Sequence, residues 1–206
     1  MTQMQRIVPY QPLDLQEPAD LVEAIRQRRG GQFINLDRML LHSAPFARGW
    51  NGFLGEVRNN LSLAPKLREL AMCGVAVLNG AEYEFIHHAP EFLAAGGAQI
   101  QVDALRFIGQ NEFQRELFSE LEQAAIDLTV QMTRVIQVEN ELMVKLKNTL
   151  GEQALVELVG VIATYNMVSR FLVALHVTPE HWPDNFLGAK QNCWVKEAWQ
   201  RGFADW

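Results

Sequence analysis

Helical periodicity runs through almost the whole chain after its first dozen residues, and this feature constrains the fold most strongly. Apolar residues recur three and four positions apart, which is typical of amphipathic helices. No pair of segments shows the alternating pattern of neighbouring strands, so we expect an all-α fold. The predicted helices cover 17–30, 35–43, 43–57, 67–78, 81–95, 102–107, 112–135, 138–151 and 152–175.

Local signals mark where several of these helices begin and end. Ser43 stands where an N-cap is expected, just before a proline in the first turn. Asn79 and Gly80 break the chain between 67–78 and 81–95. Because this connection is tight, we expect the two helices to pack as an antiparallel hairpin. The fold class that follows is a multi-helix antiparallel bundle of helical hairpins.

One segment, 152–175, is apolar nearly all round the helix. A helix without a polar face belongs in the core or at an interface between subunits. The chain has 206 residues, of which 49% are hydrophobic, so it can bury a sizeable core in a single domain.

Composition argues against several classes of partner. The net charge is −6 with both signs interspersed, which disfavours a nucleic-acid partner. The basic cluster at 26–31 is short and suits the C-terminus of a helix. Cys73 and Cys193 are isolated, as expected in a reducing cytoplasm. The longest uncharged apolar stretch, 158–169, is shorter than the roughly 20 residues that span a bilayer, so we expect a cytoplasmic protein with no membrane partner.

The stretch "LRELAMCGVAVLNGAEYEFIHH" places carboxylates and histidines around an apolar run. On a helix, Ala81, Glu84 and His88 lie along one stripe. The antiparallel hairpin brings Glu69 of the preceding helix toward His88. A carboxylate surrounded by apolar side chains has a raised pKa, and an imidazole beside it can exchange protons with a substrate. These residues therefore predict a site for proton transfer.

Two other interpretations of the same stretch stay open. Glu84 and His88 can form an ordinary pair, four residues apart, on a solvated helix face. The spacing of Glu84 and His87 is the one used in di-iron helical bundles, whose sites need a second such pair. The chain has no second Glu-x-x-His, so we expect no metal.

Longer stretches of the sequence resemble a known superfamily. "LRELAMCGVAVLNGAEYEFIHHAPEFLAAGG" is similar to the core of the carboxymuconolactone decarboxylase and alkylhydroperoxidase D superfamily, and "TYNMVSRFLVALHV" is similar to its closing helix. The resemblance covers roughly 21–177. It implies an all-α fold of helical hairpins, a homo-oligomer of three or six subunits, and chemistry without a cofactor.

The peroxidase branch of this superfamily uses a Cys-x-x-Cys pair followed by a histidine and preceded by a glutamate. In this register Glu69 takes the glutamate position and His88 the histidine position, while Ala81 and Glu84 replace the two cysteines. Neither replacement supplies a thiolate to attack a peroxide. Cys73 lies in an apolar helix, so an antioxidant peroxidase that uses it is the less favoured alternative.

The decarboxylase branch needs no thiol. Loss of CO2 from a carboxylated lactone leaves an oxyanion that must be stabilised and a carbon that must be protonated. The resemblance implies His88 as the general acid, with Glu69 or Glu84 setting its protonation. Arginines hold carboxylates with matching geometry, so the candidate substrate-binding residues are Arg48, Arg68 and Arg170, with Tyr83.

These considerations leave three interpretations of the function. The leading one is a carboxy-lyase or related proton-transfer enzyme acting on a small carboxylated substrate. The peroxidase and a non-catalytic helical oligomer are the alternatives. We expect one domain over 1–206, with a core at 21–177 and a tail at 178–206 that holds four of the five tryptophans and packs against its own or a neighbouring subunit.

Overall fold

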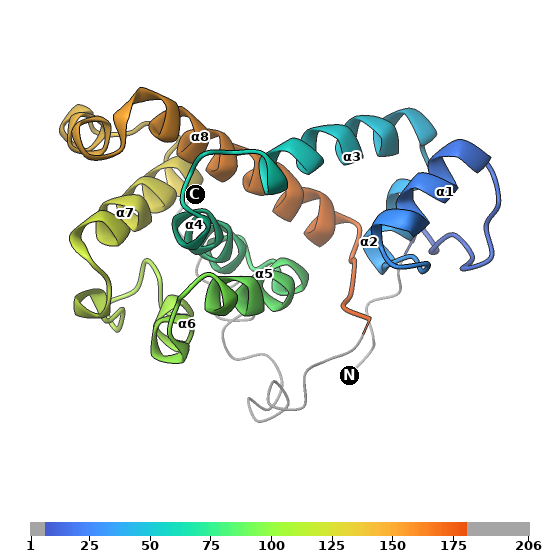
Figure 1. Cartoon of the computed structure of the whole chain (residues 1–206). Coiled ribbons are helices and arrows are strands. Elements are labelled where there is room, and N and C mark those ends of the chain that lie inside the picture. The colour runs from blue at the N-terminus through green and yellow to red at the C-terminus, as the bar shows by residue number, and fades with distance from the viewer. Residues whose placement is uncertain (1–6, 181–206) are drawn as a thin grey trace.

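The computed structural model describes residues 7–180, and over them the chain is all-helical, as predicted (Figure 1). The tryptophan-rich tail lies outside the described residues apart from 178–180. The elements are α1 (Ala19–Arg28), α2 (Asn35–Leu40), α3 (Ala44–Asn59), α4 (Pro65–Leu78), α5 (Glu82–Ala94), α6 (Gln99–Leu105), the short 3-10 helix η1 (Arg115–Leu117), α7 (Glu120–Arg134) and α8 (Asn140–Ala174).

Helix α4 is the centre of the fold. It packs against α5, α7 and α8, and every residue from position 69 to 78 is buried. Gly74 lets α7 approach closely, because a Cβ at this position would lie 3.2 Å from Thr129 Cγ2 and from Ile108 Cδ1. A polar side chain within positions 69–78 is therefore removed from water. Glu69 is the one charged residue in this stretch.

The hairpin of α4 and α5 is formed as predicted (Figure 1). Gly80 adopts the left-handed conformation with φ 64°, which glycine reaches without steric cost. Its amide donates to the carbonyl of Val77, and the amide of Ala81 donates to the carbonyl of Ala76 at 2.8 Å. This pair of bonds is the Schellman motif, which ends α4 and turns the chain back along it.

Helix α7 begins later than predicted, at Glu120 rather than at residue 112. Ser119 and Glu122 form a capping box: Glu122 N–H donates to Ser119 Oγ, and Ser119 N–H donates to Glu122 Oε2 at 2.8 Å. This reciprocal capping fixes the helix start. The residues before it form turns and η1, and the helix predicted at 102–107 lies at Gln99–Leu105.

The predicted break at Gly151 is confirmed. Gly151 has φ 78° and ψ 173°, which divides α8 into two helical segments. Its second segment buries one side, including Leu158 and Tyr165, and leaves Val156 and Met167 exposed. Helix α8 packs against α4 and α7, so its buried side belongs to the core of the domain.

Among the described helices, α8 alone is long and apolar enough to cross a membrane by length and composition. The core helix of a soluble protein passes the same test. In α8, 44% of the most apolar 18-residue stretch is buried against the rest of the chain. The break at Gly151 also divides the helix into two segments.

Candidate functional site

Glu69 and His88 meet across the α4–α5 hairpin. Nδ1 of His88 lies 2.7 Å from Oε2 of Glu69, in the register that the sequence predicts. A carboxylate can only accept, so Nδ1–H of His88 is the donor and the lone pair of Nε2 is left available. Arg68 donates from Nε to Oε1 of the same carboxylate at 3.3 Å. Glu69 thus fixes the tautomer and orientation of the imidazole.

The environment sets the charges of this pair. Burial acts to raise the pKa of Glu69, but the interactions with His88 and Arg68 outweigh it, so the pKa lies below its ordinary value. Burial lowers the pKa of His88, although Glu69 opposes the shift. At neutral pH the pair is therefore a carboxylate beside a neutral imidazole.

Glu84 lies one turn before His88 on α5, and the structure rules out a solvated position for it. Its side chain is buried, with 2% of the residue exposed. Ser169 of α8 donates from Oγ to Oε2 of Glu84 at 2.7 Å, whereas Oε1 has no hydrogen-bond partner among the described residues. Burial raises the pKa of Glu84 well above its ordinary value, against smaller opposing effects from Ser169 and Arg58. Glu69, and not Glu84, bonds the imidazole.

Arg58 and Tyr165 form a second polar pair beside these residues. Nε of Arg58, near the end of α3, donates to the hydroxyl of Tyr165 on α8 at 3.0 Å. The Tyr165 ring meets the His88 imidazole edge to face, with 4.8 Å between the centroids. Three helices thus place an arginine, a tyrosine and a histidine in one cluster.

Arg58, Glu84 and His88 line a partly open cavity of about 250 Å³. Ligand pockets commonly have about 300–1,000 Å³, and this cavity lies just below that range, so a ligand that fits it must be small. Two arginines give it positive charge, and four aliphatic side chains provide apolar walls. The lining residues are Arg29, Ile34, Leu36, Arg58, Tyr83, Glu84, His87, His88, Glu91, Val168 and Leu172.

Arg29 is held in place by a buried acidic residue. Asp37 of α2 is 1% exposed and accepts from Nε of Arg29 at 3.0 Å and from Nη2 of Arg28 at 3.1 Å. An aspartate at this depth needs such partners, because an unpaired buried charge is costly. Arg29 keeps its planar guanidinium beside the cavity as a result.

Glu180, at the end of the described chain, contacts two of the residues that line the cavity. Glu180 accepts from the amide of Asn35 at 2.5 Å and from the Tyr83 hydroxyl at 3.3 Å, and lies 3.4 Å from Nε2 of His87. Burial acts against it, but these partners lower the pKa of Glu180 to about 2. Tyr83 also stacks on His87, with 4.2 Å between the centroids. Tyr83 therefore lines the cavity, as predicted for a substrate contact, while bonded to the chain's own carboxylate.

The three arginines predicted to bind substrate do not line the cavity. Arg48 pairs with Asp20 on the surface at 2.6 Å, and Arg170 donates to the carbonyl oxygen of Asn166 on the exposed side of α8. Arg68 lies within the site but bonds Glu69. Helical position cannot select among arginines, because the choice depends on which helix faces pack together.

Arg29 and Arg58 are the arginines that sequence reasoning missed. Arg29 belongs to the basic cluster at 26–31, and the sequence indicated only that its positive charge suits the C-terminus of a helix. Arg58 meets a tyrosine 107 positions later, and no local pattern signals that contact. Ser169 and Tyr165 were missed for the same reason, whereas His87 was considered only as a metal ligand.

Cys73 is fully buried in α4, with 0% exposed. Burial, with the nearby Glu69 and Glu84, raises the pKa of its thiol well above the ordinary value. A thiol of this kind is protonated and poorly nucleophilic. Within residues 7–180, no group of three histidine, cysteine or acidic side chains is arranged to hold a metal ion.

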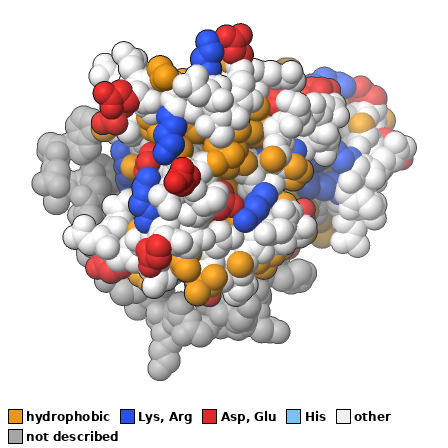
Figure 2. Space-filling view, turned by 60° about the vertical axis from the view of Figure 1, so that its left-hand side comes forward, with side chains coloured by type: hydrophobic (Ala, Val, Ile, Leu, Met, Phe, Trp, Pro, Cys, Tyr) orange, Lys and Arg blue, Asp and Glu red, His pale blue; other side chains and the backbone are white. Residues whose placement is uncertain are grey.

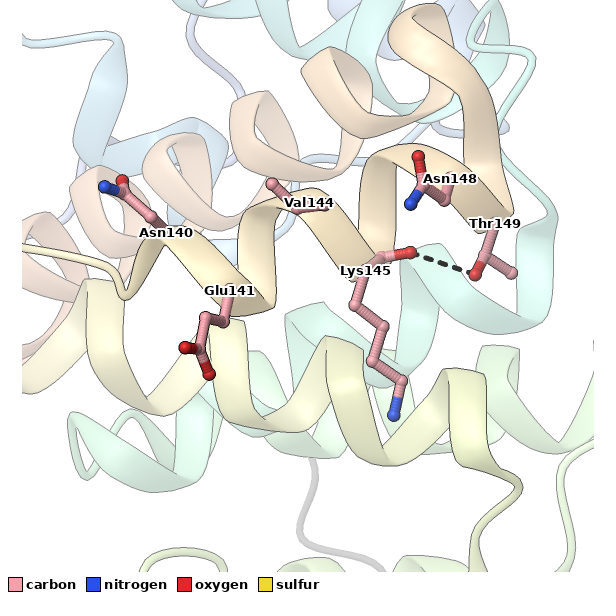
Figure 3. A pocket seen from close by; sticks show the side chains of 6 residues that line it. All are labelled: Asn140, Glu141, Val144, Lys145, Asn148 and Thr149. Atoms are coloured by element: carbon pink, nitrogen blue, oxygen red, sulfur yellow. Dashed lines mark hydrogen bonds between the residues drawn. The ribbon is translucent and has the colours of Figure 1, made fainter.

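A second hollow lies on the surface of the first segment of α8 (Figure 3). Its lining residues are Asn140, Glu141, Val144, Lys145, Asn148 and Thr149, and its volume is about 560 Å³. All six come from one helix, and the hydrogen bond drawn among them runs from Thr149 Oγ1 to the carbonyl of Lys145. Within residues 7–180 no second element brings groups toward them, so this hollow does not form a convergent site.

Comparison with known proteins supports the resemblance seen in the sequence. Residues 44–110, which include α3, α4, α5 and α6, match the model of the carboxymuconolactone decarboxylase family. No curated protein sequence matches the chain significantly.

Several solved structures share the fold. An uncharacterized peroxidase-related protein from Silicibacter sp. TM1040 has a TM-score of 0.71 at 16% identity, over 90% of this chain and 98% of that one. A peroxidase-related protein from Ralstonia eutropha JMP134 with an alkylhydroperoxidase AhpD core has a TM-score of 0.71 at 15% identity, over 91% and 97%. The debrominase Bmp8, as a cysteine-to-alanine variant in complex with 2,3,4-tribromopyrrole, has a TM-score of 0.66 at 15% identity, over 94% and 97%.

Proposed function

We propose that this chain, whose residues 44–110 match the carboxymuconolactone decarboxylase family and whose fold is shared with alkylhydroperoxidase D-like proteins, is a cofactor-free proton-transfer enzyme of that superfamily. Its substrate is a small carboxylated lactone or a related enolisable acid, and the leading reaction is decarboxylation. The observation that carries the proposal is the bond between Glu69 and His88, with the imidazole lining a cavity that also holds two arginines.

The cavity favours a small anionic ring. Arg58, whose Nε is bonded to Tyr165, can hold a carboxylate through its two Nη groups, and Arg29, whose Nε and Nη2 are bonded to Asp37, adds a second guanidinium to the lining. Ile34, Leu36 and Val168 provide apolar surface for the ring. The debrominase with the same fold binds a small ring, 2,3,4-tribromopyrrole, which supports a ligand of this size.

Decarboxylation divides into two steps at this site. The bond between the ring carbon and the departing CO2 breaks first, and its electron pair is delocalised onto the lactone carbonyl oxygen. His88 then delivers a proton from Nε2 to the ring carbon, and water restores that proton for the next turnover. This use of His88 requires an imidazolium, which the carboxylates of a bound substrate favour by raising the imidazole pKa. Glu69 stabilises the cation through Nδ1–H.

The peroxidase alternative has weaker support. It needs an accessible thiolate, whereas Cys73 is fully buried and its pKa is raised by burial. The positions that hold cysteines in that branch hold Ala81 and Glu84 here.

The test is CO2 release from 4-carboxymuconolactone by the purified wild-type protein beside His88→Ala. We expect release by the wild type and its loss in the variant. His42→Ala is the matched control, because His42 lies on the surface, bonded to the carbonyl of Pro9, and does not line the cavity. Equal loss in both variants would point to a general effect on folding. No release by the wild type would exclude this substrate.

A further inference from the structure

Glu84 has one hydrogen-bonding atom that the protein leaves unused. Its residue is 2% exposed, it lines the cavity, and Oε1 has no partner among the described residues. Buried side-chain oxygens nearly always have a partner, so an exception calls for an explanation. The other oxygen, Oε2, accepts the Ser169 hydroxyl at 2.7 Å.

Among the described residues, none gives Glu84 a counter-ion in contact with it. Arg58 from α3 is the cation whose charge reaches it, but Nε of Arg58 is bonded to Tyr165. Cys73 from α4 and Tyr165 from α8 are neutral at physiological pH, since burial raises the pKa of both. His88 on the same helix is paired with Glu69. An ionised Glu84 would therefore be a buried carboxylate with a single neutral donor.

We infer that Glu84 is a neutral carboxylic acid whose free hydroxyl donates a hydrogen bond to the substrate oxygen on which negative charge develops. Because Ser169 donates to Oε2, the proton of the acid belongs on Oε1, the unpartnered atom. The inference deepens the proposed function and rests on it. It gives the two side chains separate tasks: His88 protonates carbon, and Glu84 stabilises the oxyanion.

The positions of Glu84 and His88 are compatible with these two roles. Glu84 and His88 are four residues apart on α5, so their side chains lie on the same face of the helix and both line the cavity. A substrate between them can present its carbonyl oxygen to one and its reacting carbon to the other. A donor already in place in a water-poor site stabilises developing charge without reorganising. A neutral acid also avoids repelling an anionic substrate.

The protonation state can be measured without any substrate. The infrared difference spectrum of wild type minus Glu84→Gln at neutral pH should show the carbonyl band of a protonated carboxyl group, shifted in D2O. The matched control, Glu69→Gln, should show carboxylate bands instead. Only carboxylate bands for Glu84 would overturn the inference. If Glu84→Gln does not fold, NMR of wild type labelled with 13C at the glutamate carboxyl groups gives the answer. One signal should then remain that of a neutral acid well above about pH 4.3, the ordinary glutamate pKa.

Kinetics on 4-carboxymuconolactone test the catalytic part. Replacing Glu84 by Met removes the donor and should lower kcat by about 10²–10³-fold with little change in KM. Glu84→Gln keeps an N–H donor and should lose less, and Ser169→Ala, which leaves the acid in place, should lose least. An active wild type with an equally active Glu84→Met overturns the inference and leaves the proposed function standing. An inactive wild type overturns the proposed function, and the catalytic role of Glu84 with it, whatever the infrared result.

Discussion

At the scale of single residues, two similarly buried glutamates of the α4–α5 hairpin take opposite protonation states because their partners differ. Glu69 and Glu84 have nearly the same low exposure, yet one is paired with an imidazole and an arginine and the other with a serine. Charged partners favour the ionised form, and burial without them favours the neutral form. One site therefore holds a carboxylate, Glu69, across the hairpin from His88, and a carboxylic acid, Glu84, four residues before His88 on α5.

Glu84 makes stability depend on pH in a direction that can be worked out. Above about pH 4.3 the unfolded chain releases the Glu84 proton, while the folded chain keeps it because its pKa is raised. The unfolded state then binds fewer protons, so stability falls as pH rises toward the folded pKa. Each unit of pKa shift corresponds to about 1.4 kcal/mol.

We predict that Glu84→Gln removes this dependence. Urea unfolding of both proteins at several pH values should show the variant gaining stability relative to wild type as pH rises from about 4.5 to 8. Glu91→Gln is a control on an exposed position of α5 and should follow the wild type. A constant difference between wild type and Glu84→Gln at all pH values would contradict the raised pKa.

The thiol of Cys73 should be unreactive in the native protein. It is 0% exposed, and burial raises its pKa, so both access and thiolate are lacking. With Cys193 replaced by Ser to leave one thiol, a disulfide reagent should label Cys73 in urea and label it much more slowly without urea. Rapid labelling of the folded protein would revive the peroxidase alternative.

At the scale of elements, two local devices define the hairpin and the helix that covers it: the Schellman turn at Gly80 and the capping box at Ser119. Both consist of bonds between residues within five positions of each other. Such devices can be recognised in a sequence, and the Gly80 break was predicted. The start of α7 was predicted eight residues too early, because periodicity alone was followed past the capping box at Ser119.

A pair of glycine substitutions tests the turn. Gly80→Ala places a Cβ at φ 64° and should lower the free energy of unfolding by about 1 kcal/mol. Gly49→Ala, in the middle of α3 with open space around its Cβ, should raise it by about 0.5–1 kcal/mol through helix propensity. Both are measured by urea unfolding. Equal effects at the two sites would mean that the left-handed turn does not control the hairpin.

At the scale of the whole molecule, large apolar side chains remain on the surface. Figure 2 shows one face on which hydrophobic side chains gather near the centre, among acidic and basic ones. On α3, Phe46 and Phe53 are 46% and 53% exposed, and on α8 Val156 is 70% exposed. Apolar surface of this kind is often covered by a partner. We propose that it is covered by further copies of the chain, in a homo-oligomer of three or six.

Analytical ultracentrifugation tests this assembly. The chain has a mass of 23.4 kDa, and we expect a species of three or six times that mass. Phe53→Asp should shift the population toward the monomer by placing a charge in the interface. Ile100→Asp on α6 is the matched control, since Ile100 is 56% exposed, and should leave the mass unchanged. A monomeric wild type would contradict the proposal.

The sequence by itself determined the helices, the break at Gly80 and the meeting of Glu69 with His88. These features depend on contacts within a few residues or across one tight turn, where spacing alone fixes which side chains face each other. The choice of arginines, the Ser169 partner of Glu84 and the cavity were decided by the tertiary structure. Arg58 meets Tyr165 across 107 positions and Ser169 meets Glu84 across 85. Such contacts follow from how whole helix faces pack against α4, and no local pattern in the chain encodes them.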